Sequence, residues 1–163
     1  MKVTMTKREI RTFFIALQTL APADAPRKFA YVVAHNRKTV RKVHDALVEA
    51  TKPLPDFEEQ RVALARSMAK KDPDGEPIML PNNQGYFVPD MGKFEEALKA
   101  IKKSTGQDKV DAETEELFNE EQEIDVYMVA FEYLPEKIRP DLLEAVLIMV
   151  HEPADPPTSV NSN

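Results

Sequence analysis

The segment "TKREIRTFFIALQTL", residues 6–20, contains both a helix start and the buried face of that helix. Thr6 is a residue type that caps helices, and Glu9 three positions later completes the pattern of a capping box. Apolar side chains then recur every three or four residues, a spacing that places them on one side of a helix. These residues are Ile10, Phe13, Phe14, Leu17 and Leu20. The segment therefore predicts an amphipathic helix packed against a core.

The flanking residues predict a strand before this helix and a second helix after it. Residues 1–5, "MKVTM", alternate apolar and polar side chains as a short strand does. Residues 21–26, "APADAP", hold two prolines that end the first helix and form a short connector. The second helix is expected to begin near Arg27 and to fold back antiparallel on the first. Its expected buried stripe is Phe29, Val33, Val40, Val43 and Leu47.

Three further helices are predicted downstream. The first covers residues 56–70, with Asp56 placed to cap its start, and the second is capped by Asp90. The last has Pro140 at its first position and Asp141 just after it. The residues expected to be buried are Phe57, Val62, Leu64, Ala65 and Met68 in the first, Phe94, Leu98 and Ile101 in the second, and Leu143, Val146, Leu147 and Val150 in the last.

Residues 70–90, "KKDPDGEPIMLPNNQGYFVPD", are rich in turn-forming residues. Asp72-Pro73-Asp74-Gly75 has turn chemistry, because proline presets φ, aspartate bonds nearby backbone amides and glycine accepts a positive φ. Two strand-like runs, 78–80 and 86–88, flank Asn82-Asn83-Gln84-Gly85. The prolines at 77, 81 and 89 each lack a donor for strand pairing, so the pattern predicts a small peripheral β-hairpin.

After residue 110 the amino-acid composition changes from acidic to apolar and then to that of a polar tail. Residues 111–123 are strongly acidic, with only Leu117 and Phe118 large and apolar, which fits either a solvated helix or a mobile loop. Residues 123–134, "EIDVYMVAFEYL", carry apolar side chains on both faces of an extended chain, so we expect them to form a central strand. Residues 151–163 have no apolar periodicity and are expected to be a disordered tail.

These elements predict one α+β domain over residues 1–150, with an N-terminal antiparallel helical hairpin and further helices packed on a small sheet that includes the peripheral β-hairpin. A length of 163 residues suits a single domain. The chain has no cysteine, which excludes disulfides, thiolate zinc sites and thiol nucleophiles. No apolar run approaches the roughly 20 residues that cross a bilayer, and the N-terminus lacks the apolar stretch of a secretory signal. The expected location is the cytoplasm.

The net charge of -6 conceals an uneven distribution along the chain. Residues 1–52 hold 11 Lys and Arg against 4 Asp and Glu, whereas the remainder holds 11 against 24. The molecule is therefore expected to be dipolar. Such asymmetry can steer a partner or orient self-association, although it says nothing about the fold.

The sequence indicates no reaction centre. Asp72 and Asp74 resemble the opening of a calcium loop, but the position of its glutamate is occupied by Pro81. His35 and His44 lie nine residues apart and face nearly opposite sides of a helix, so they cannot share a metal. No serine lies in a glycine-flanked elbow, and 4 glycines cannot build a glycine-rich phosphate loop. We expect no enzyme activity, no metal and no cofactor.

Two groups of charged residues are candidates for partner binding. Arg37, Lys38, Arg41 and Lys42, called the cationic patch below, stack one turn apart on the second helix. The patch fits a solvated face, contact with an acidic protein surface, or nucleic-acid binding, although it contains no aromatic residue that could stack on a base. The acidic residues between 111 and 125 offer a complementary surface in the same molecule or a neighbouring copy, which would allow self-association. Its candidate residues are Glu115, Glu116, Glu120 and Glu121.

Several short motifs occur together in one order along the chain. They are Ala16-Leu17 and Leu20 in the first helix, Lys28, Ala30 and Tyr31 at the start of the second, the Asp-Gly hairpin, and the ending Pro140-Asp141-Leu142-Leu143. This order resembles small uncharacterised proteins encoded by tailed bacteriophages, over nearly the whole ordered chain. The long acidic insertion at 103–123 and the proline-rich tail depart from that pattern. The resemblance implies phage origin and a small α+β fold, and it carries no catalytic motif.

Together these observations predict a non-enzymatic viral protein that binds another protein, as a virion component or an accessory of virion assembly. The alternative is a phage inhibitor of a host enzyme, RNA polymerase or a defence nuclease, acting in host takeover through its acidic surface. The expected location is the host cytoplasm or the virion, and the expected partner is a phage structural protein or a host protein. Nucleic-acid binding is less favoured, and no membrane association is expected.

Overall fold

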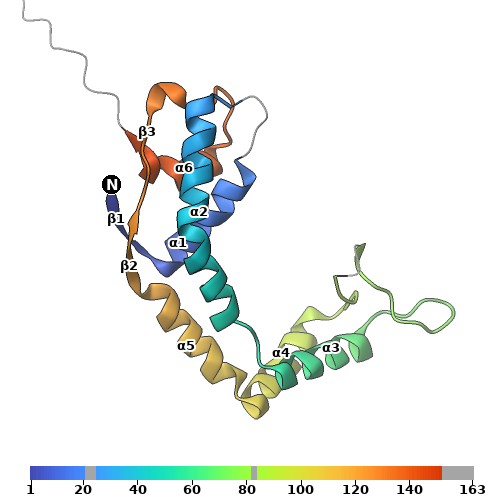
Figure 1. The fold of residues 1–163 in the computed structure, drawn as a ribbon. Helices are drawn as coiled ribbons and strands as arrows, with labels where there is room; N and C mark the ends of the chain where they lie inside the picture. The colour runs from blue at the N-terminus through green and yellow to red at the C-terminus, as the bar shows by residue number, and fades with distance from the viewer. Residues whose placement is uncertain (21–24, 82–83, 152–163) are drawn as a thin grey trace, which may run out of the picture. The chain divides into compact units, whose positions relative to one another are not determined.

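The computed structural model describes residues 1–20, 25–81 and 84–151. These residues form two compact units: unit 1 contains Met1–Glu49 and the described part of Leu117–Asn163, and unit 2 is Ala50–Glu116. The predicted α+β class is confirmed, because helices are combined with two small sheets of two strands each (Figure 1). One domain over residues 1–150 stays a prediction, and each unit is described by itself.

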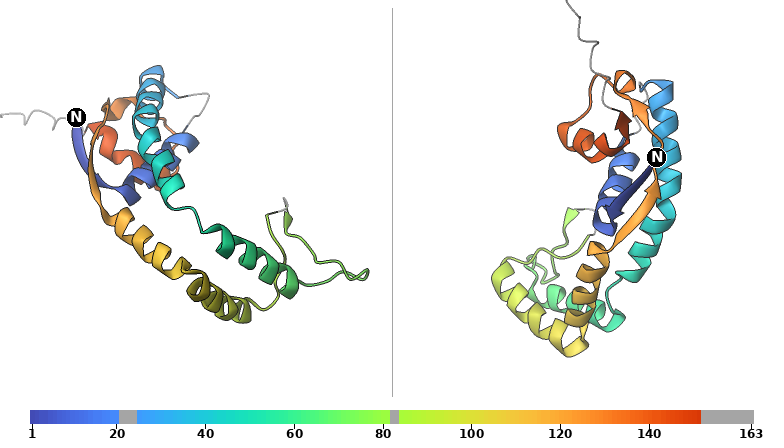
Figure 2. Two further views of the ribbon diagram at one scale, coloured as in Figure 1. Left: turned by 60° about the horizontal axis from the view of Figure 1, so that its bottom comes forward. Right: turned by 90° about the vertical axis from the view of Figure 1, so that its left-hand side faces the viewer.

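Unit 1 joins the first strand of the chain to a strand from its second half. β1 (Lys2–Thr6) pairs antiparallel with β2 (Glu121–Asp125), and the two run side by side in Figure 2. Met5 and Ile124 are buried on the core side. On the exposed side, Lys2 Nζ lies 2.6 Å from the Glu123 carboxylate. The predicted N-terminal strand is therefore present, and residues 121–123, the end of the acidic stretch, lie opposite its residues 4–6.

The capping box that the sequence predicts is present at the start of α1 (Lys7–Thr19). The Thr6 hydroxyl accepts a hydrogen bond from the Glu9 backbone N–H at 3.2 Å, and the Glu9 carboxylate accepts one from the Thr6 N–H at 2.7 Å. The five apolar residues predicted to share one face of this helix are all buried. Local chemistry thus sets where α1 begins and which side faces the core.

The charge on Glu9 is expected to contribute to stability at neutral pH. The backbone and hydroxyl hydrogen bonds from Thr6 lower the pKa of Glu9, so this contribution is present above the unfolded pKa and is lost as pH falls through the lowered folded pKa. Glu9→Gln should reduce the free energy of unfolding by about 0.5 kcal/mol near pH 7. In urea denaturation the difference from wild type should shrink as the pH falls below the unfolded pKa of Glu9 and disappear below its lowered folded pKa. A constant difference, or the same trend in the exposed control Glu136→Gln, would contradict this.

The core of unit 1 lies between α1, α2 (Arg27–Ala50) and the C-terminal elements. Four residues of the predicted stripe on α2 are buried and Val43 is half-buried. α6 (Pro140–Val146) begins at Pro140 as predicted, and η3 (Leu147–Met149) follows it. Leu147 was expected to be buried but is 51% exposed, because the change to three residues per turn rotates it away from the side of Val146.

The predicted central strand at residues 123–134 is wrong. β2 ends at Asp125, β3 is only Val129–Ala130, and residues 131–133 form a 3₁₀ turn, η2 (Phe131–Tyr133). β3 pairs in parallel with β4 (Val150–His151), so the segment leaves one sheet and joins another. Tyr127 and Phe131 are exposed, whereas Val129 between them is buried. His151, predicted as the start of a disordered tail, belongs to β4, and the rest of that tail lies outside the described residues.

Unit 2 contains α3 (Pro55–Met68), α4 (Met91–Thr105) and most of α5 (Gln107–Asn119). The acidic stretch is therefore largely helical, one of the two forms that its composition allows. Phe57, Ala65 and Phe94 are buried as predicted, whereas Val62 is 42% exposed. Asp56 does not cap α3: proline presets the helical φ at Pro55, so the helix starts one residue earlier and its cap is Leu54.

The segment at 70–90 is a bent hairpin. The Asp72 carboxylate accepts hydrogen bonds from the backbone N–H groups of Asp74 and Glu76 at 3.0 and 2.9 Å, and Gly75 has φ +86°. One isolated antiparallel bridge, between Lys71 and Pro77, closes the aspartate turn, and a second, between Met79 and Tyr86, takes the place of the continuous strands expected around the loop. Residues 82 and 83 of that loop lie outside the described residues. The aspartate cluster thus has the backbone bonds of a turn, and Asp90 caps α4 as predicted.

Candidate binding surface

An open groove of about 450 Å³ lies in unit 1 beside the N-terminal end of α2. Its lining comes from α2, from the segment between β2 and η2, and from η2 itself. The lining residues are Arg27, Lys28, Tyr31, Val32, Tyr127, Met128, Val129, Ala130 and Tyr133. Val32 and Val129 are buried and form an apolar floor. Because three tyrosines line it, we call it the tyrosine groove.

Two of the three tyrosine side chains of the groove are exposed to solvent. Tyr31 is 63% exposed and Tyr127 is 43% exposed. The opposite side of α2 packs in the core, which leaves Tyr31 facing outward. The His35 ring stacks on Tyr127 with centroids 3.6 Å apart, and the Tyr31 ring centroid lies 6.2 Å from that of His35. The three rings form a continuous aromatic row across two segments that are distant in sequence.

Asn36 holds this arrangement in place from inside the core. Its side chain is 1% exposed; Oδ1 accepts from the Tyr127 N–H at 2.8 Å and Nδ2 donates to the Tyr127 carbonyl at 2.9 Å. The side-chain amide therefore makes the two bonds that a neighbouring strand would make, at the place where the chain leaves β2. Our reading of the sequence missed Asn36, although its position three residues after Val33 and four before Val40 puts a polar residue on the buried stripe.

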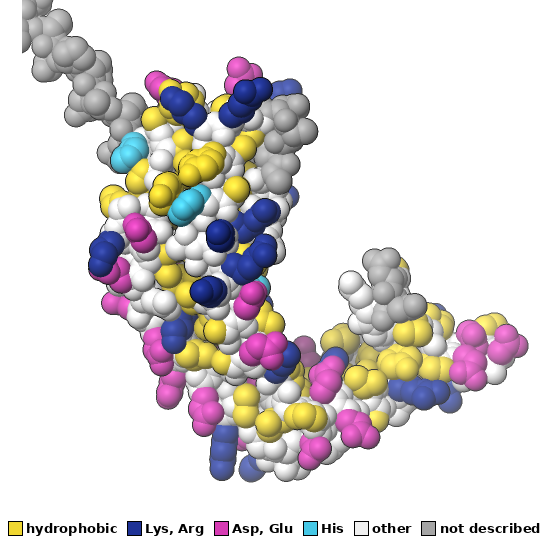
Figure 3. Space-filling model, in the orientation of Figure 1, with side chains coloured by type: hydrophobic (Ala, Val, Ile, Leu, Met, Phe, Trp, Pro, Cys, Tyr) yellow, Lys and Arg dark blue, Asp and Glu magenta, His cyan; other side chains and the backbone are white. Residues whose placement is uncertain are grey.

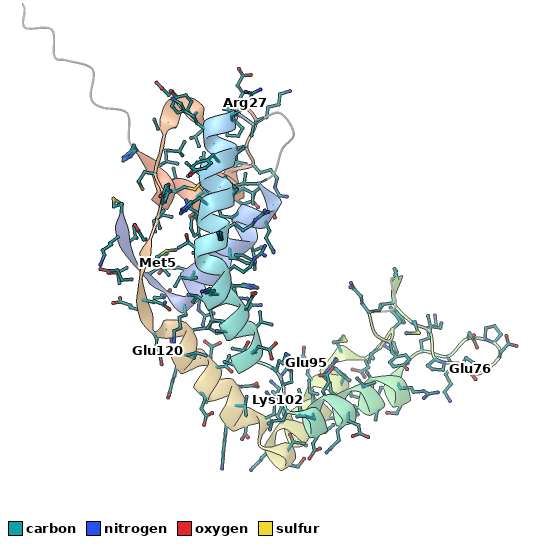
Figure 4. The ribbon with its side chains drawn as sticks, in the orientation of Figure 1. Met5, Arg27, Glu76, Glu95, Lys102 and Glu120 are labelled. Atoms are coloured by element: carbon teal, nitrogen blue, oxygen red, sulfur yellow. The ribbon has the colours of Figure 1, made fainter. Side chains whose placement is uncertain are left out.

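The groove has a cationic end. Lys28 Nζ lies 4.1 Å from the centre of the Tyr133 ring and donates to its hydroxyl oxygen at 2.6 Å. This hydrogen bond raises the pKa of Lys28, which keeps the ammonium group charged. Arg27 lies at the same end of α2 (Figure 4). An anionic group that approaches this end therefore meets two positive charges.

The cationic patch continues from the groove along α2. Lys38, Arg41 and Lys42 are exposed and Arg37 is half-buried. Tyr31, His35, Lys38 and Lys42 succeed one another at steps of four, three and four residues, so they follow one side of the helix. In Figure 3, Lys and Arg side chains gather over the middle of α2, next to hydrophobic surface near its start. The structure thus places aromatic residues beside a patch that has none in its own sequence stretch.

The four acidic candidates do not form one described surface. Glu115 and Glu116 belong to unit 2, whereas Glu120 and Glu121 belong to unit 1. The Glu120 carboxylate forms an ion pair with Lys7 Nζ, and the Glu121 backbone lies opposite Thr6 in the β1–β2 pair. Glu120 and Glu121 therefore take part in the fold, and a role for the four residues in partner binding stays a prediction.

The two histidines of α2 have separate aromatic neighbours. His44 stacks on Phe14 with centroids 4.1 Å apart, and its Nδ1 lies 3.3 Å from the Asp45 carboxylate. His35 stacks on Tyr127, and its buried Nδ1 has no hydrogen-bond partner among the described residues. Within residues 1–20, 25–81 and 84–151, no group of His, Asp and Glu side chains is arranged to hold a metal ion. No helix in these ranges has the length and apolarity to span a membrane.

Comparison with protein-family models, with curated proteins and with solved structures finds no match for this chain. The groove and the patch are therefore interpreted from their own chemistry.

Proposed function

We propose that this protein acts by binding another protein, without catalysis, and that the tyrosine groove is where it docks. The observation that carries the proposal is the exposure of Tyr31, at 63%, above the buried floor of Val32 and Val129. Protein interfaces are enriched in tyrosine and arginine, and their strongest contacts place an aromatic or apolar anchor in a pocket. A partner side chain seated on this floor would gain about 25 cal/mol for each Å² of apolar surface removed from water.

A protein partner suits this groove better than nucleic acid does. Single-stranded nucleic acid binds by stacking successive bases on free aromatic faces. Here one face of Tyr127 is covered by His35, and Lys28 lies over one face of Tyr133. The floor is formed by aliphatic side chains, which favour a partner that offers an apolar side chain.

The proposed setting is a bacteriophage, with the protein either part of the virion or an accessory of its assembly; the resemblance of its motif order to small phage proteins supports this. The alternative is an inhibitor of a host RNA polymerase or defence nuclease, acting through the acidic residues of α5 and β2. The two differ in where the protein is found. A virion component stays with purified particles, whereas an inhibitor is recovered with one host protein early in infection.

The docking site can be tested with a photo-crosslinking residue at Tyr31. The variant Tyr31→p-benzoylphenylalanine, irradiated in infected cells, is expected to form one dominant covalent product with a second protein. The same change at Ile15, which is 48% exposed on α1, is the matched control and should form none. Tyr31→Ala should reduce recovery of that protein about ten-fold, and Ile15→Ala should not. Crosslinking of equal strength at both positions would contradict the proposal.

A further inference from the structure

We propose that the segment bound by the tyrosine groove is acidic, with Asp or Glu residues on either side of one large apolar anchor. This inference rests on the proposed function and adds the chemistry of the partner. It is carried by the positive charges that flank the groove and continue from it, five of which take part in no ion pair among the described residues.

The cations lie in line with the groove. Arg27 and Lys28 stand at its end, and Lys38, Arg41 and Lys42 follow along the same helix. At 1.5 Å per residue, the distance along α2 from Arg27 to Lys42 is roughly 22 Å. An extended segment of about seven residues covers this length, with its anchor in the groove and carboxylates toward the patch.

Among the described residues, no ion pair engages Arg27, Arg37, Lys38, Arg41 or Lys42. The only acidic residues of α2, Asp45 and Glu49, come after Lys42, and Asp45 lies against His44. Lys28 donates a hydrogen bond to the Tyr133 hydroxyl, and Glu132 is a carboxylate close enough to act on its charge. The protein as a whole carries a charge of -6, so this surface attracts anions while the rest of the molecule repels them.

The apolar floor of the groove favours a partner segment that carries a large apolar side chain as its anchor. A chain of carboxylates alone would leave the exposed Tyr31 and Tyr127 rings of the groove uncovered, and single exposed ion pairs contribute only about 0–1 kcal/mol each. A leucine, phenylalanine or tryptophan side chain in the groove adds apolar burial to the electrostatic attraction. The two contributions together favour an acidic protein segment over a simple anion.

Selection from a random peptide library tests the proposed amino-acid composition of the bound segment. A yeast-displayed library of 16-residue peptides would be panned against the full chain at low ionic strength. The recovered peptides are expected to be enriched in Asp and Glu around one aromatic or leucine residue. The Kd of the best peptide should rise at least ten-fold on Tyr31→Ala, and also in the triple variant Lys38→Gln, Arg41→Gln and Lys42→Gln.

A second triple variant controls for overall charge. Lys99→Gln, Lys103→Gln and Lys109→Gln remove the same number of charges from exposed positions in unit 2 and should leave the Kd unchanged. Circular dichroism and the unfolding midpoint would show that both triple variants are folded. Added salt should weaken peptide binding to wild type more than to the first triple variant.

The outcomes separate this inference from the proposed function. Suppose that the selected peptides need Tyr31 for binding but are not acidic, and that their Kd is the same for wild type and the first triple variant. This result would overturn the inference and leave the proposal of protein binding intact. Failure to select any peptide that depends on Tyr31 would overturn both. A labelled oligothymidylate that binds more tightly than the best peptide would assign the surface to nucleic acid. A dimer in sedimentation that the first triple variant abolishes would assign it to a second copy; either result overturns the inference.

Discussion

Asn36→Ala is expected to lower the free energy of unfolding by about 3 kcal/mol, measured by urea denaturation near neutral pH. The substitution removes both hydrogen bonds between the Asn36 amide and the Tyr127 backbone. It also leaves the Tyr127 N–H and carbonyl groups without their partner, next to a core position that is 1% exposed. Each buried polar group left unpaired costs about 1–3 kcal/mol, which is more than the net value of an ordinary hydrogen bond.

Two further variants test the cause of this loss. Gln18→Ala removes an amide from an exposed position on α1 and should change stability by less than about 0.5 kcal/mol. Asn36→Asp keeps an acceptor for the Tyr127 N–H but turns a carboxylate oxygen toward the Tyr127 carbonyl, so it should destabilise at least as much as alanine does. A loss below about 1 kcal/mol for Asn36→Ala would show that Tyr127 finds other partners.

Asn36 also links stability to the candidate binding surface. Tyr127 lies on the groove, and its ring stacks on His35, the residue before Asn36. A backbone that is no longer held at Tyr127 cannot keep this ring in register with Tyr31. Asn36→Ala is therefore expected to weaken partner binding even under conditions where the protein stays folded. The buried Asn36 side chain thus determines the shape of the tyrosine groove, although Asn36 does not line it.

Sequence patterns correctly predicted the elements that are determined by residues close to one another in the chain. The capping box of Thr6 and Glu9, the buried face of α1 and the turn at Asp72 were all correct, because each depends on residues within one or two turns of the chain. Asp56 was assigned as a cap because its residue type is right. Pro55 moved the helix start by one position, since a preset φ needs no side-chain bond.

The error at the predicted central strand has a different cause, which is a long-range partner. Residues 123–134 have the composition of a buried strand, but the Asn36 side chain takes the place of a neighbouring strand at Tyr127, from 91 residues away. Tyr127 and Phe131 are exposed as a result, and no pattern within the segment reports this. The tyrosine groove was missed for the same reason. The sequence placed the cationic patch on α2, but only the fold brings Tyr127 and Tyr133 beside Tyr31.

Phe118 shows how one residue resolves an ambiguous segment. The acidic stretch allowed either a solvated helix or a loop, and the structure shows α5 with most of its carboxylates exposed. Phe118, near the end of that helix, is only 6% exposed. The guanidinium carbons of Arg8 and Arg11 lie 5.2 and 5.5 Å from the centre of its ring. One apolar ring and two cations therefore join the end of α5 to α1.

Phe118→Ala is accordingly expected to lower the free energy of unfolding by about 4 kcal/mol, since truncation of a buried phenylalanine costs about 3–5 kcal/mol. Urea denaturation measures this loss. Phe131→Ala is the matched control, because Phe131 is 55% exposed, and it should cost less than about 1 kcal/mol.

The variant Phe118→Leu distinguishes the contribution of the aromatic ring to stability from the contribution of apolar burial. Leucine restores most of the apolar volume but gives Arg8 and Arg11 no aromatic face, and each cation–π contact is worth about 0.5–1 kcal/mol when partly exposed. We expect Phe118→Leu to cost about 1–2 kcal/mol. If leucine were as damaging as alanine, the shape of the ring would matter more than its burial. If both cost less than about 1 kcal/mol, Phe118 would not hold the end of α5 to α1, and residues 117–123 would owe their position to the β1–β2 pair and the ion pair of Lys7 with Glu120 instead.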